Sequence, residues 1–257
     1  MAGARPVKPP APHTVIGKVR LILNALAESG GVLGLSELAR RTDLSKATVH
    51  RLCGELVAWG VVQRAGDAFR LGSLLFELGS RVPARRLLRD AALHFLEDLS
   101  VASGQTVHLA VLDGLDVMYV ERLPGRSTRE VPSSVASRLP LHCTATGRCL
   151  LAFGPAELFE QVVAAGLTQR TARSVGEGDE LRRLLDQVRL DGVATEIGEV
   201  FAGLMSVGAP VFELGNQLVG AISVTGGIDE LDATALTPLV RLAAAGLSRR
   251  LGASMPV

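Results

Sequence analysis

The first 71 residues read as a series of short amphipathic helices that ends in a hairpin, and this order limits the fold more than any other feature of the chain. Apolar side chains recur at helical spacing over 19–26 and again over 49–57. A short helix that begins at Ser36 is predicted between them, and residues 42–44 form a tight connection to the third helix. Alternating residues over 61–71 predict a β-hairpin. Helix, helix, short turn, helix and hairpin within about 60 residues is the plan of a winged helix-turn-helix.

The third predicted helix, which begins after Ser45, has the composition of a DNA-recognition helix. Small side chains and Arg51 lie opposite its buried apolar side. Small residues let the helix backbone approach the major groove, and an arginine that binds guanine is the commonest specific contact. The capped helix start, which carries Lys46, favours phosphate.

The hairpin adds two arginines that can follow the DNA backbone or the minor groove. A solvated helix face would explain any single residue of the set, but the combination favours DNA. The predicted DNA-binding residues are Ser36, Ser45, Lys46, Ala47, Thr48, His50, Arg51, Arg64 and Arg70.

Charge is distributed unevenly along the chain, although the formal net charge is only +1. Residues 1–72 contain ten Lys/Arg and five Asp/Glu, a balance of +5, whereas residues 73–257 contain seventeen and twenty-one, a balance of −4. A basic N-terminal part on an acidic remainder favours a polyanion as its partner. The excess is modest, so it supports the DNA prediction only together with the helix pattern.

Length and composition exclude several other classes of protein. The 257 residues suffice for two domains, and 47% apolar with 21% charged residues is typical of a chain that folds around a core. The longest charge-free run, 214–228, has 15 residues, fewer than the roughly 20 apolar residues of a membrane helix. The proline-rich residues 1–12 lack the apolar segment of a signal peptide. Three cysteines, an odd number, are expected to be free thiols in a reducing cytoplasm.

Changes in the pattern predict four segments along the chain. They are a disordered tail over 1–13, the winged helix-turn-helix domain over 14–72, a linker helix over 73–83 and a second domain over 84–251. The apolar residues Leu74, Leu75 and Leu78 of the linker helix either pack on the winged domain or form a dimer contact. The sequence favours neither alternative.

The second domain mixes strands and helices. Strands are predicted over 106–112, 117–122, 207–212 and 218–225 and near Val131. Helices are predicted over 84–100, 144–153, 156–165, 179–190 and 237–251. Antiparallel hairpins with helices grouped around them indicate an α+β, sensor-like domain.

Neither a catalytic motif nor a metal site is predicted. His142, Cys143 and Cys149 lack the ligand spacing of a zinc site, so they are interpreted as core residues. The sequence has no G-x-S-x-G, no Walker loop and no H-E-x-x-H. Glu196 and Glu199 lie three residues apart without a helical stripe, so no acid–base dyad is expected. We therefore predict a protein without catalytic residues, metal or cofactor, which is not an enzyme.

Several segments together resemble the IclR family of transcriptional regulators. In the winged region these segments are 35–42, 46–52 and 69–72. In the linker helix the segment is 78–79, and in the second domain they are 106–110, 137–142, Ala152, Gly203, 207–211 and 221–224. The resemblance keeps the family's order and covers nearly the whole chain, from Val15 to Leu251.

The resemblance implies a two-domain α+β regulator, with an N-terminal winged helix-turn-helix, a linker helix and a C-terminal GAF-like, mixed α/β ligand-binding domain built on a mixed sheet. Similar proteins are cytoplasmic homodimers or homotetramers that bind pseudo-palindromic operators in double-stranded DNA, as repressors or activators. They respond to a small-molecule effector. A small organic acid or an aromatic or carbonyl metabolite is the expected effector here.

The resemblance also implies an effector site in the second domain. It combines apolar contacts with two backbone amides at a helix start, one acid and several hydroxyls. The acid is Glu196 where an Asp is usual, Ser206 stands at a position that is usually Cys, and Met205 stands where Arg is usual. Amides and hydroxyls can hold a carboxylate or carbonyl without a buried cation. The implied effector residues are Val131, Leu139, Ala145, Thr146, Glu196, Leu204, Ser206, Ser223 and Thr225.

Two other functions are compatible with parts of the sequence. One is an enzyme with a GAF-like domain, whose winged region is only an interaction module; the absence of catalytic motifs and the basic first domain speak against it. The other is an architectural DNA-binding protein without an effector, which would leave about two thirds of the chain without a role. A ligand-responsive regulator is the prediction that uses both domains.

Overall fold

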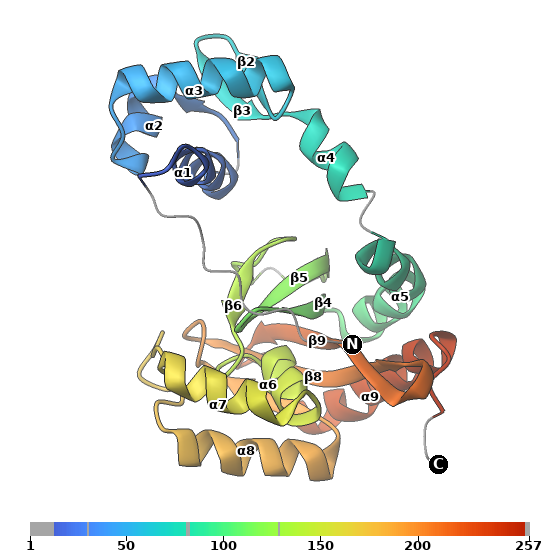
Figure 1. Cartoon of the computed structure of the whole chain (residues 1–257). Helices are drawn as coiled ribbons and strands as arrows, with labels where there is room; N and C mark the ends of the chain where they lie inside the picture. Colours follow the sequence, from blue (N-terminus) through green and yellow to red (C-terminus); the bar gives the residue numbers. More distant parts are fainter. Residues whose placement is uncertain (1–12, 30, 81–82, 128, 255–257) are drawn as a thin grey trace. The chain divides into compact units, whose positions relative to one another are not determined.

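The computed structural model describes residues 13–29, 31–80, 83–127 and 129–254 (Figure 1). Apart from His13, the predicted tail therefore lies outside the described residues. Contacts divide the chain into two compact units, Met1–Arg86 and Leu87–Val257, and each unit is described by itself.

Unit 1 is a winged helix-turn-helix. Its elements are α1 (Val15–Glu28), β1 (Leu33–Gly34), α2 (Leu35–Thr42), α3 (Lys46–Trp59), β2 (Val62–Ala65), β3 (Ala68–Leu71) and α4 (Ser73–Ser80). The strands form an antiparallel sheet in the order β1-β3-β2. Fully buried Ile22, Leu38 and Val49 join the three helices in one core. The prediction from the first 71 residues is confirmed, and β1 is an addition to it.

The start of α2 differs from its prediction. Gly34, not Ser36, is the N-cap of α2, and Ser36 lies exposed in the first turn. The following acid has two partners within this short helix, because Glu37 accepts hydrogen bonds from the guanidinium groups of Arg40 and Arg41. These charged partners lower the pKa of the Glu37 carboxyl to about 2.

Helix α4 divides its apolar residues between two environments. Leu74 and Leu75 pack against the core of the winged unit. Phe76 and Leu78 are 79% and 49% exposed. Packing on the winged unit therefore accounts for two of the three predicted linker leucines, whereas Leu78 and the neighbouring Phe76 are exposed apolar side chains in unit 1.

Unit 2 is built on one six-stranded sheet. Its elements are α5 (Pro83–Ser103), β4 (Thr106–Asp113), β5 (Asp116–Leu123), β6 (Arg138–Pro140), α6 (Ala145–Phe153), α7 (Ala156–Ala165), α8 (Gly178–Asp191), β7 (Ala194–Ile197), β8 (Leu204–Glu213), the 3₁₀ turn η1 (Leu214–Asn216), β9 (Gln217–Gly227) and α9 (Ala233–Arg250). The strand order is β6-β5-β4-β9-β8-β7, and all five pairings are antiparallel. The antiparallel hairpins predicted from the sequence are therefore confirmed, whereas the sheet is not mixed in strand direction as the family resemblance implied.

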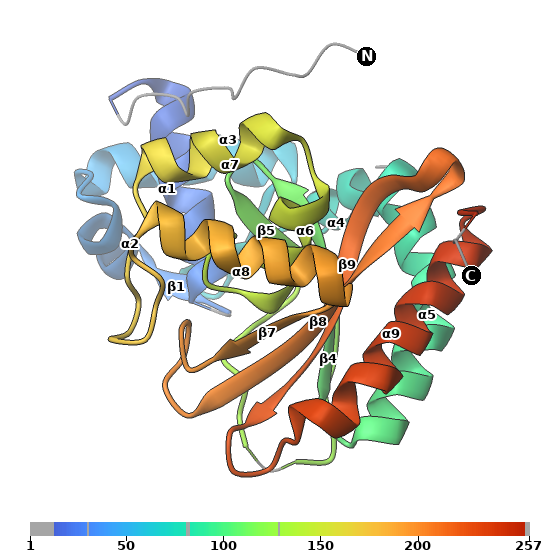
Figure 2. The same cartoon turned by 90° about the horizontal axis from the view of Figure 1, so that it is seen from below.

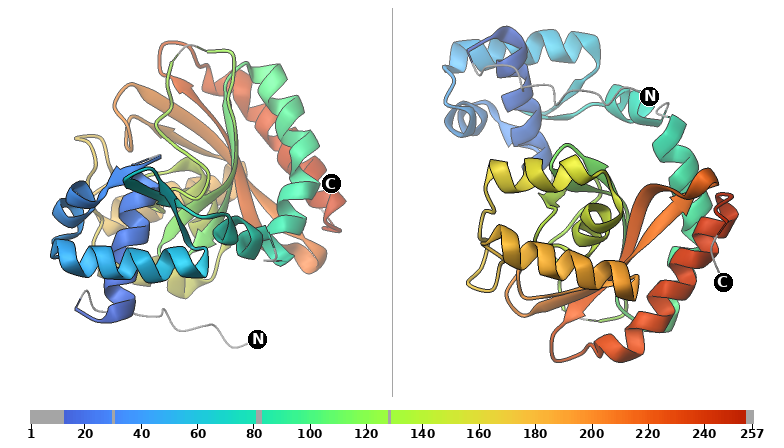
Figure 3. Two further views of the ribbon diagram at one scale, coloured as in Figure 1. Left: turned by 90° about the horizontal axis from the view of Figure 1, so that it is seen from above. Right: turned by 60° about the horizontal axis from the view of Figure 1, so that its bottom comes forward.

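Helices cover both faces of this sheet (Figure 2). Helices α5 and α9 lie side by side on one face, and α6, α7 and α8 lie on the other, as both panels of Figure 3 also show. Because side chains alternate along a strand, Ile222 and Val224 of β9 enter the core beneath α5 and α9. Ser223 and Thr225 point to the opposite face and line a cavity near the start of α6.

Two features of unit 2 escape the sequence patterns. Val131 lies in the loop between β5 and β6, not on a strand, although it is buried as expected. The edge strands β6 and β7 have only three and four residues, too few to show an alternation. No helix among the described residues is long and apolar enough to cross a membrane.

Candidate functional site

The predicted recognition helix, α3, presents its polar residues to solvent. Ser45 is its N-cap, and the Ser45 hydroxyl accepts a hydrogen bond of 3.2 Å from the amide of Thr48. Lys46, Ala47 and His50 are exposed, while Val49 on the opposite side is fully buried. The helix therefore has the orientation within unit 1 that a groove-reading helix requires.

Arg51 occupies the middle of this exposed face and has a partner within the helix. Its Nη1 lies 2.6 Å from Oε1 of Glu55, one turn further along α3, and both side chains are 61% exposed. An exposed pair at this spacing is weak. Separating Arg51 from Glu55 therefore costs little free energy.

The two arginines of the hairpin lie on different faces of it. Arg64 pairs with Phe69 in the β2–β3 register, and its guanidinium carbon lies 5.4 Å from the centre of the Phe69 ring. Arg70 pairs with Gln63 at the next position, so its side chain points to the other face. The structure thus separates two residues that the sequence analysis treated alike.

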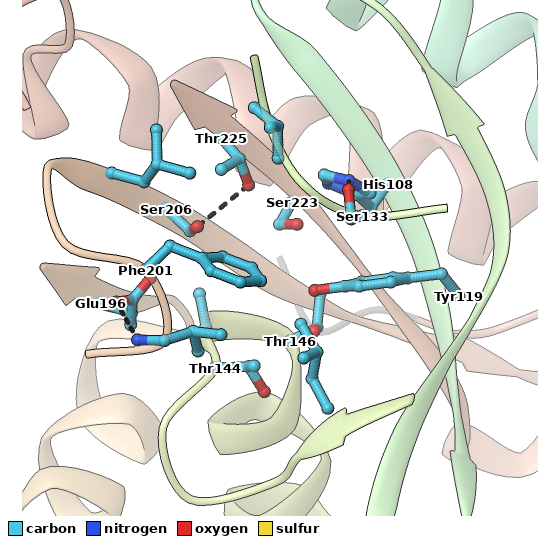
Figure 4. A pocket seen from close by; sticks show the side chains of 15 residues that line it. His108, Tyr119, Ser133, Thr144, Thr146, Glu196, Phe201, Ser206, Ser223 and Thr225 are labelled. Atoms are coloured by element: carbon cyan, nitrogen blue, oxygen red, sulfur yellow. Dashed lines mark hydrogen bonds between the residues drawn. The ribbon is translucent and has the colours of Figure 1, made fainter. Parts of the chain in front are cut away.

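A single cavity in unit 2 collects all nine predicted effector residues. They come from six parts of the chain, the β5–β6 loop, β6, α6, β7, β8 and β9, and Figure 4 shows the polar ones around one space. The cavity wall also contains six residues that were not predicted: His108, Tyr119, Ser133, Thr144, Val200 and Phe201. None of the described residues that line the cavity is a lysine or an arginine.

Helix α6 begins at the cavity wall. Its N-cap, Thr144, accepts a hydrogen bond of 3.1 Å from the amide of Gly147. The preceding amides, those of Ala145 and Thr146, have no acceptor within the helix, because the first turn of a helix leaves its N–H groups unused. Both residues are at most 2% exposed. Two buried amides and the positive end of the helix dipole therefore form a receptor for an anion or a carbonyl oxygen.

Gly208 of β8 allows this close approach of α6 to the sheet. A Cβ atom at position 208 would lie 3.1 Å from the carbonyl carbon of Ala145 and 3.2 Å from the amide nitrogen of Thr146. The glycine thus leaves the room that the first turn of α6 takes.

The acid on the cavity wall, Glu196, is buried and has an unusual protonation behaviour. Its Oε1 accepts hydrogen bonds from the amides of Glu199 and Val200, and the distance to the Val200 amide is 3.2 Å. Burial nevertheless raises the pKa of Glu196 to about 7, against the opposing effect of these bonds. The carboxyl therefore exchanges its proton close to neutral pH.

Glu199, the neighbouring acid, belongs to a structural ion pair. The Arg148 Nη2 donates to both carboxylate oxygens of Glu199, at 2.7 and 2.6 Å. The other nitrogens of Arg148 donate to the carbonyls of His142 and Thr195, each at 3.0 Å. This pair fastens α6 to the β7–β8 connection, and it leaves no donor nitrogen of Arg148 without a partner.

The cavity is narrow in this structure. The space open to the centre of a water-sized sphere is about 20 Å³, room for about one water molecule. Phe201, from the β7–β8 connection, reaches between the polar side chains toward Tyr119 (Figure 4). Its other neighbour is Arg170, whose guanidinium carbon lies 5.9 Å from the ring centre. A ligand larger than water therefore has to displace Phe201.

The histidine and cysteines considered for a metal are placed as core residues. Cys143 and Cys149 are fully buried free thiols, and burial raises the pKa of each to about 12. His142 is 3% exposed, and its Nε2 lies 3.2 Å from the carbonyl of Thr168. No group of three potential metal ligands occurs among the described residues.

Comparisons with known proteins agree with this arrangement. The family model for the IclR helix-turn-helix domain matches residues 16–66, and that for the bacterial transcriptional regulator IclR C-terminal domain matches 82–249. The glycerol operon regulatory protein of Streptomyces griseus is 34% identical over 239 residues, 90% of this chain and 94% of that protein. The regulator XynR of Escherichia coli is 30% identical over 237 residues, 90% of this chain and 94% of that protein.

Solved structures show the same fold. The Thermotoga maritima IclR structure is 27% identical and has a TM-score of 0.76, with 92% of this chain and 98% of that chain covered. An IclR homologue from Microbacterium hydrocarbonoxydans, complexed with 4-hydroxybenzoate, is 28% identical and has a TM-score of 0.82, with the same coverage.

The fold and its two candidate sites define a transcriptional regulator with a DNA-binding helix-turn-helix and a C-terminal effector-binding domain. The chain belongs to the IclR family. Its relatives are transcriptional regulators, in agreement with the absence of catalytic motifs from the sequence.

Proposed function

We propose that this regulator binds a small organic acid in the cavity of unit 2 and that the acid changes its affinity for operator DNA. The observation that carries the proposal is the start of α6, where Ala145 and Thr146 are buried and line a narrow cavity, and no carboxylate of the described residues is bonded to their amides. Helix-start amides bind carboxylates without a cation. The homologue crystallised with 4-hydroxybenzoate holds a ligand of this kind.

The remaining predicted residues fit the rest of such a ligand. Val131, Leu139 and Leu204 supply an apolar wall, and Ser223 with the Ser206–Thr225 pair supplies hydroxyls. A mostly apolar cavity with a few fixed polar groups is typical of small-molecule sites.

We further propose that the DNA-binding set acts as a two-fold pair of recognition helices on a pseudo-palindromic operator. The exposed apolar residues Phe76 and Leu78 of α4 support an assembly of at least two chains. Such a protein would work in the cytoplasm as a homodimer or homotetramer. Sedimentation at micromolar concentration should show no monomer, and a monomer that binds its operator tightly would contradict the proposal.

The experiment that tests the function combines DNA selection with ligand release. Duplexes bound by the protein are selected from a random pool, and they should contain two inverted half-sites about one helical turn apart. Small carboxylic acids, 4-hydroxybenzoate among them, are then assayed for a change in affinity for the selected duplex. The test also includes an assay for turnover of each acid, and conversion of an acid to a product would favour an enzyme instead.

Two variants locate the ligand. Thr146→Trp should fill the cavity and abolish the response, with DNA affinity in the absence of acid unchanged. Ser223→Ala should weaken the response about twofold to tenfold, since one buried hydrogen bond is worth roughly 0.5–1.5 kcal/mol. Loss of DNA binding in Ser223→Ala, with the acid response intact, would show that Ser223 is only a packing residue.

A further inference from the structure

His108 is a buried polar residue on the cavity wall to which the family resemblance assigned no role. It lies on β4 opposite Ser223 of β9, and it is 1% exposed. Its Nε2 lies 2.7 Å from Oγ of Ser133, and its ring stacks on Tyr119 with 4.5 Å between the ring centres. The imidazole is therefore fixed on two sides (Figure 4).

The other ring nitrogen of His108 has no hydrogen-bond partner. Within the described part of the chain, only five buried side-chain nitrogen or oxygen atoms lack one. Two of the five belong to residues of this cavity, Nδ1 of His108 and Oγ1 of Thr146, but the Thr146 hydroxyl has the Tyr119 phenol as a neighbouring partner, which leaves Nδ1 of His108. Buried polar atoms without partners are rare and destabilising. The presence of Nδ1 of His108 on the wall of a cavity indicates that a ligand completes its hydrogen bond.

His108 and the start of α6 are two different polar regions of the cavity wall. Thr146 lies at the start of α6, where the amides favour a negative charge. His108 comes from the middle of the sheet, next to Arg122 in the β4–β5 register. A ligand that reaches both therefore carries a second polar group besides its acid.

The charge state of His108 identifies that second group. Burial, with the nearby positive charge of Arg122, lowers the pKa of His108 to about 3, so the imidazole is neutral at neutral pH. A neutral imidazole has one donor and one acceptor nitrogen, and the bond to Ser133 leaves either kind at Nδ1. A hydroxyl group can donate or accept, so it fits both tautomers.

We propose that His108 is a specificity-determining residue of the effector site and selects small monocarboxylic acids that also carry a hydroxyl group. The proposal rests on the proposed function, in which the carboxylate of the ligand lies at the start of α6. Ser133 then acts as a positioning residue that holds the imidazole toward the hydroxyl.

Matched pairs of acids test the proposal. Binding of benzoate and 4-hydroxybenzoate, and of propanoate and 3-hydroxypropanoate, is measured by calorimetry on the full chain. The variants are His108→Phe, which keeps a ring against Tyr119, and the control His94→Phe on α5, where the histidine side chain is 77% exposed. In the wild type and the control, the hydroxy acid of at least one pair should bind about threefold to tenfold more tightly than its plain partner. In His108→Phe this preference should disappear, with the affinity for the plain acid unchanged within about twofold.

Four results would overturn the proposal. Two concern the wild type: no binding of either pair of acids, or equal affinity for both acids of each pair. Two concern His108→Phe: a preference for the hydroxy acid that survives, or an equal loss of affinity for both acids. If His108→Phe does not fold, His108→Gln and Ser133→Ala replace it, and each must reduce the preference for the hydroxy acid.

The variant Thr146→Trp distinguishes a failure of the proposed function from a failure of the role of His108. Should it leave binding of the acids intact, the ligand lies elsewhere and the proposed function fails, whereas blocked binding without a hydroxyl preference refutes only the role of His108.

Discussion

Nη1 of Arg51 lies 2.6 Å from Oε1 of Glu55 on the exposed side of the recognition helix α3. The pair keeps the guanidinium extended along the face that the helix presents to solvent. It also places a negative charge next to the residue that we expect to read a base. Substitutions at the two positions should therefore act in opposite directions.

We expect Arg51→Ala to reduce discrimination between the operator and a random duplex by about 1–3 kcal/mol. Glu55→Gln should instead tighten binding to all duplexes by about twofold, because the free energy of an exposed pair is small. Titration of both duplexes at fixed salt measures the two effects. Lys46→Ala is the control, and it should weaken binding to both duplexes alike and reduce the salt dependence by about one phosphate contact. Unchanged operator affinity in Arg51→Ala would show that α3 reads DNA through other residues.

The hairpin arginines should differ in their effect on DNA. Arg70 lies exposed on the face of the hairpin away from Phe69. Arg70→Ala should therefore weaken binding to every duplex. It should also reduce the slope of log affinity against log salt concentration by the equivalent of about one phosphate contact. Arg64 stacks on Phe69, so Arg64→Ala should leave that slope unchanged. Affinity measured at several salt concentrations distinguishes them. Equal slopes for the two variants would mean that both faces of the hairpin approach DNA.

Glu196 should make the stability of unit 2 depend on pH. Its pKa is about 7 in the folded protein and about 4.5 when unfolded, so the folded state holds the extra proton between these values. The free energy of unfolding therefore falls as the pH rises from about 4.5 to about 7. Glu196→Gln keeps an oxygen acceptor for the amides of Glu199 and Val200 but cannot ionise. Relative to the wild type, the variant should gain about 2 kcal/mol between pH 5 and pH 8 in urea unfolding. A constant difference across this range would show that Glu196 has an ordinary pKa.

Phe201 should limit access to the cavity. Because its ring occupies space that a ligand needs, Phe201→Ala should bind 4-hydroxybenzoate several-fold more tightly than the wild type does. Phe153→Ala is the matched control, since Phe153 is also half-buried but lies outside this cavity. Calorimetry measures both. Weaker binding in Phe201→Ala would mean that the ring contacts the ligand and does not compete with it.

Local patterns and the family resemblance predicted most of the elements and part of the site. Periodicity and capping residues such as Ser45 suffice for helices, and alternation with a turn signal suffices for the hairpin strands β4 and β5. The short edge strands β6 and β7 depend on pairing with distant residues, so no local signal marks them. The nine effector residues came from the resemblance, and the structure brings all of them to one cavity.

The six further cavity residues show where sequence reasoning ends. His108 stands among apolar residues of a predicted strand, and that exception to the pattern could have marked it as a candidate. Tyr119 and Phe201 could not have been identified, because a β-bulge near Leu109 sets the position of the first and a loop sets the position of the second. Likewise, the opposite orientations of Arg64 and Arg70 follow from the register of β2 with β3, which the sequence does not state.

The complete pairing of Arg148 has a consequence for the charge that an effector brings with it. Since all three guanidinium nitrogens already donate within the protein, a bound carboxylate adds a negative charge close to Glu196 that no side-chain cation on the cavity wall balances. A proton can neutralise this added charge. Glu196 is the group that can bind it, because the pKa of its carboxyl is about 7. Calorimetry of 4-hydroxybenzoate binding at pH 7.5 in buffers of different ionisation enthalpy should therefore show net proton uptake, which Glu196→Gln should remove. The regulator would then report acidification of its surroundings together with the metabolite, because the same acid binds more tightly as the pH falls through about 7.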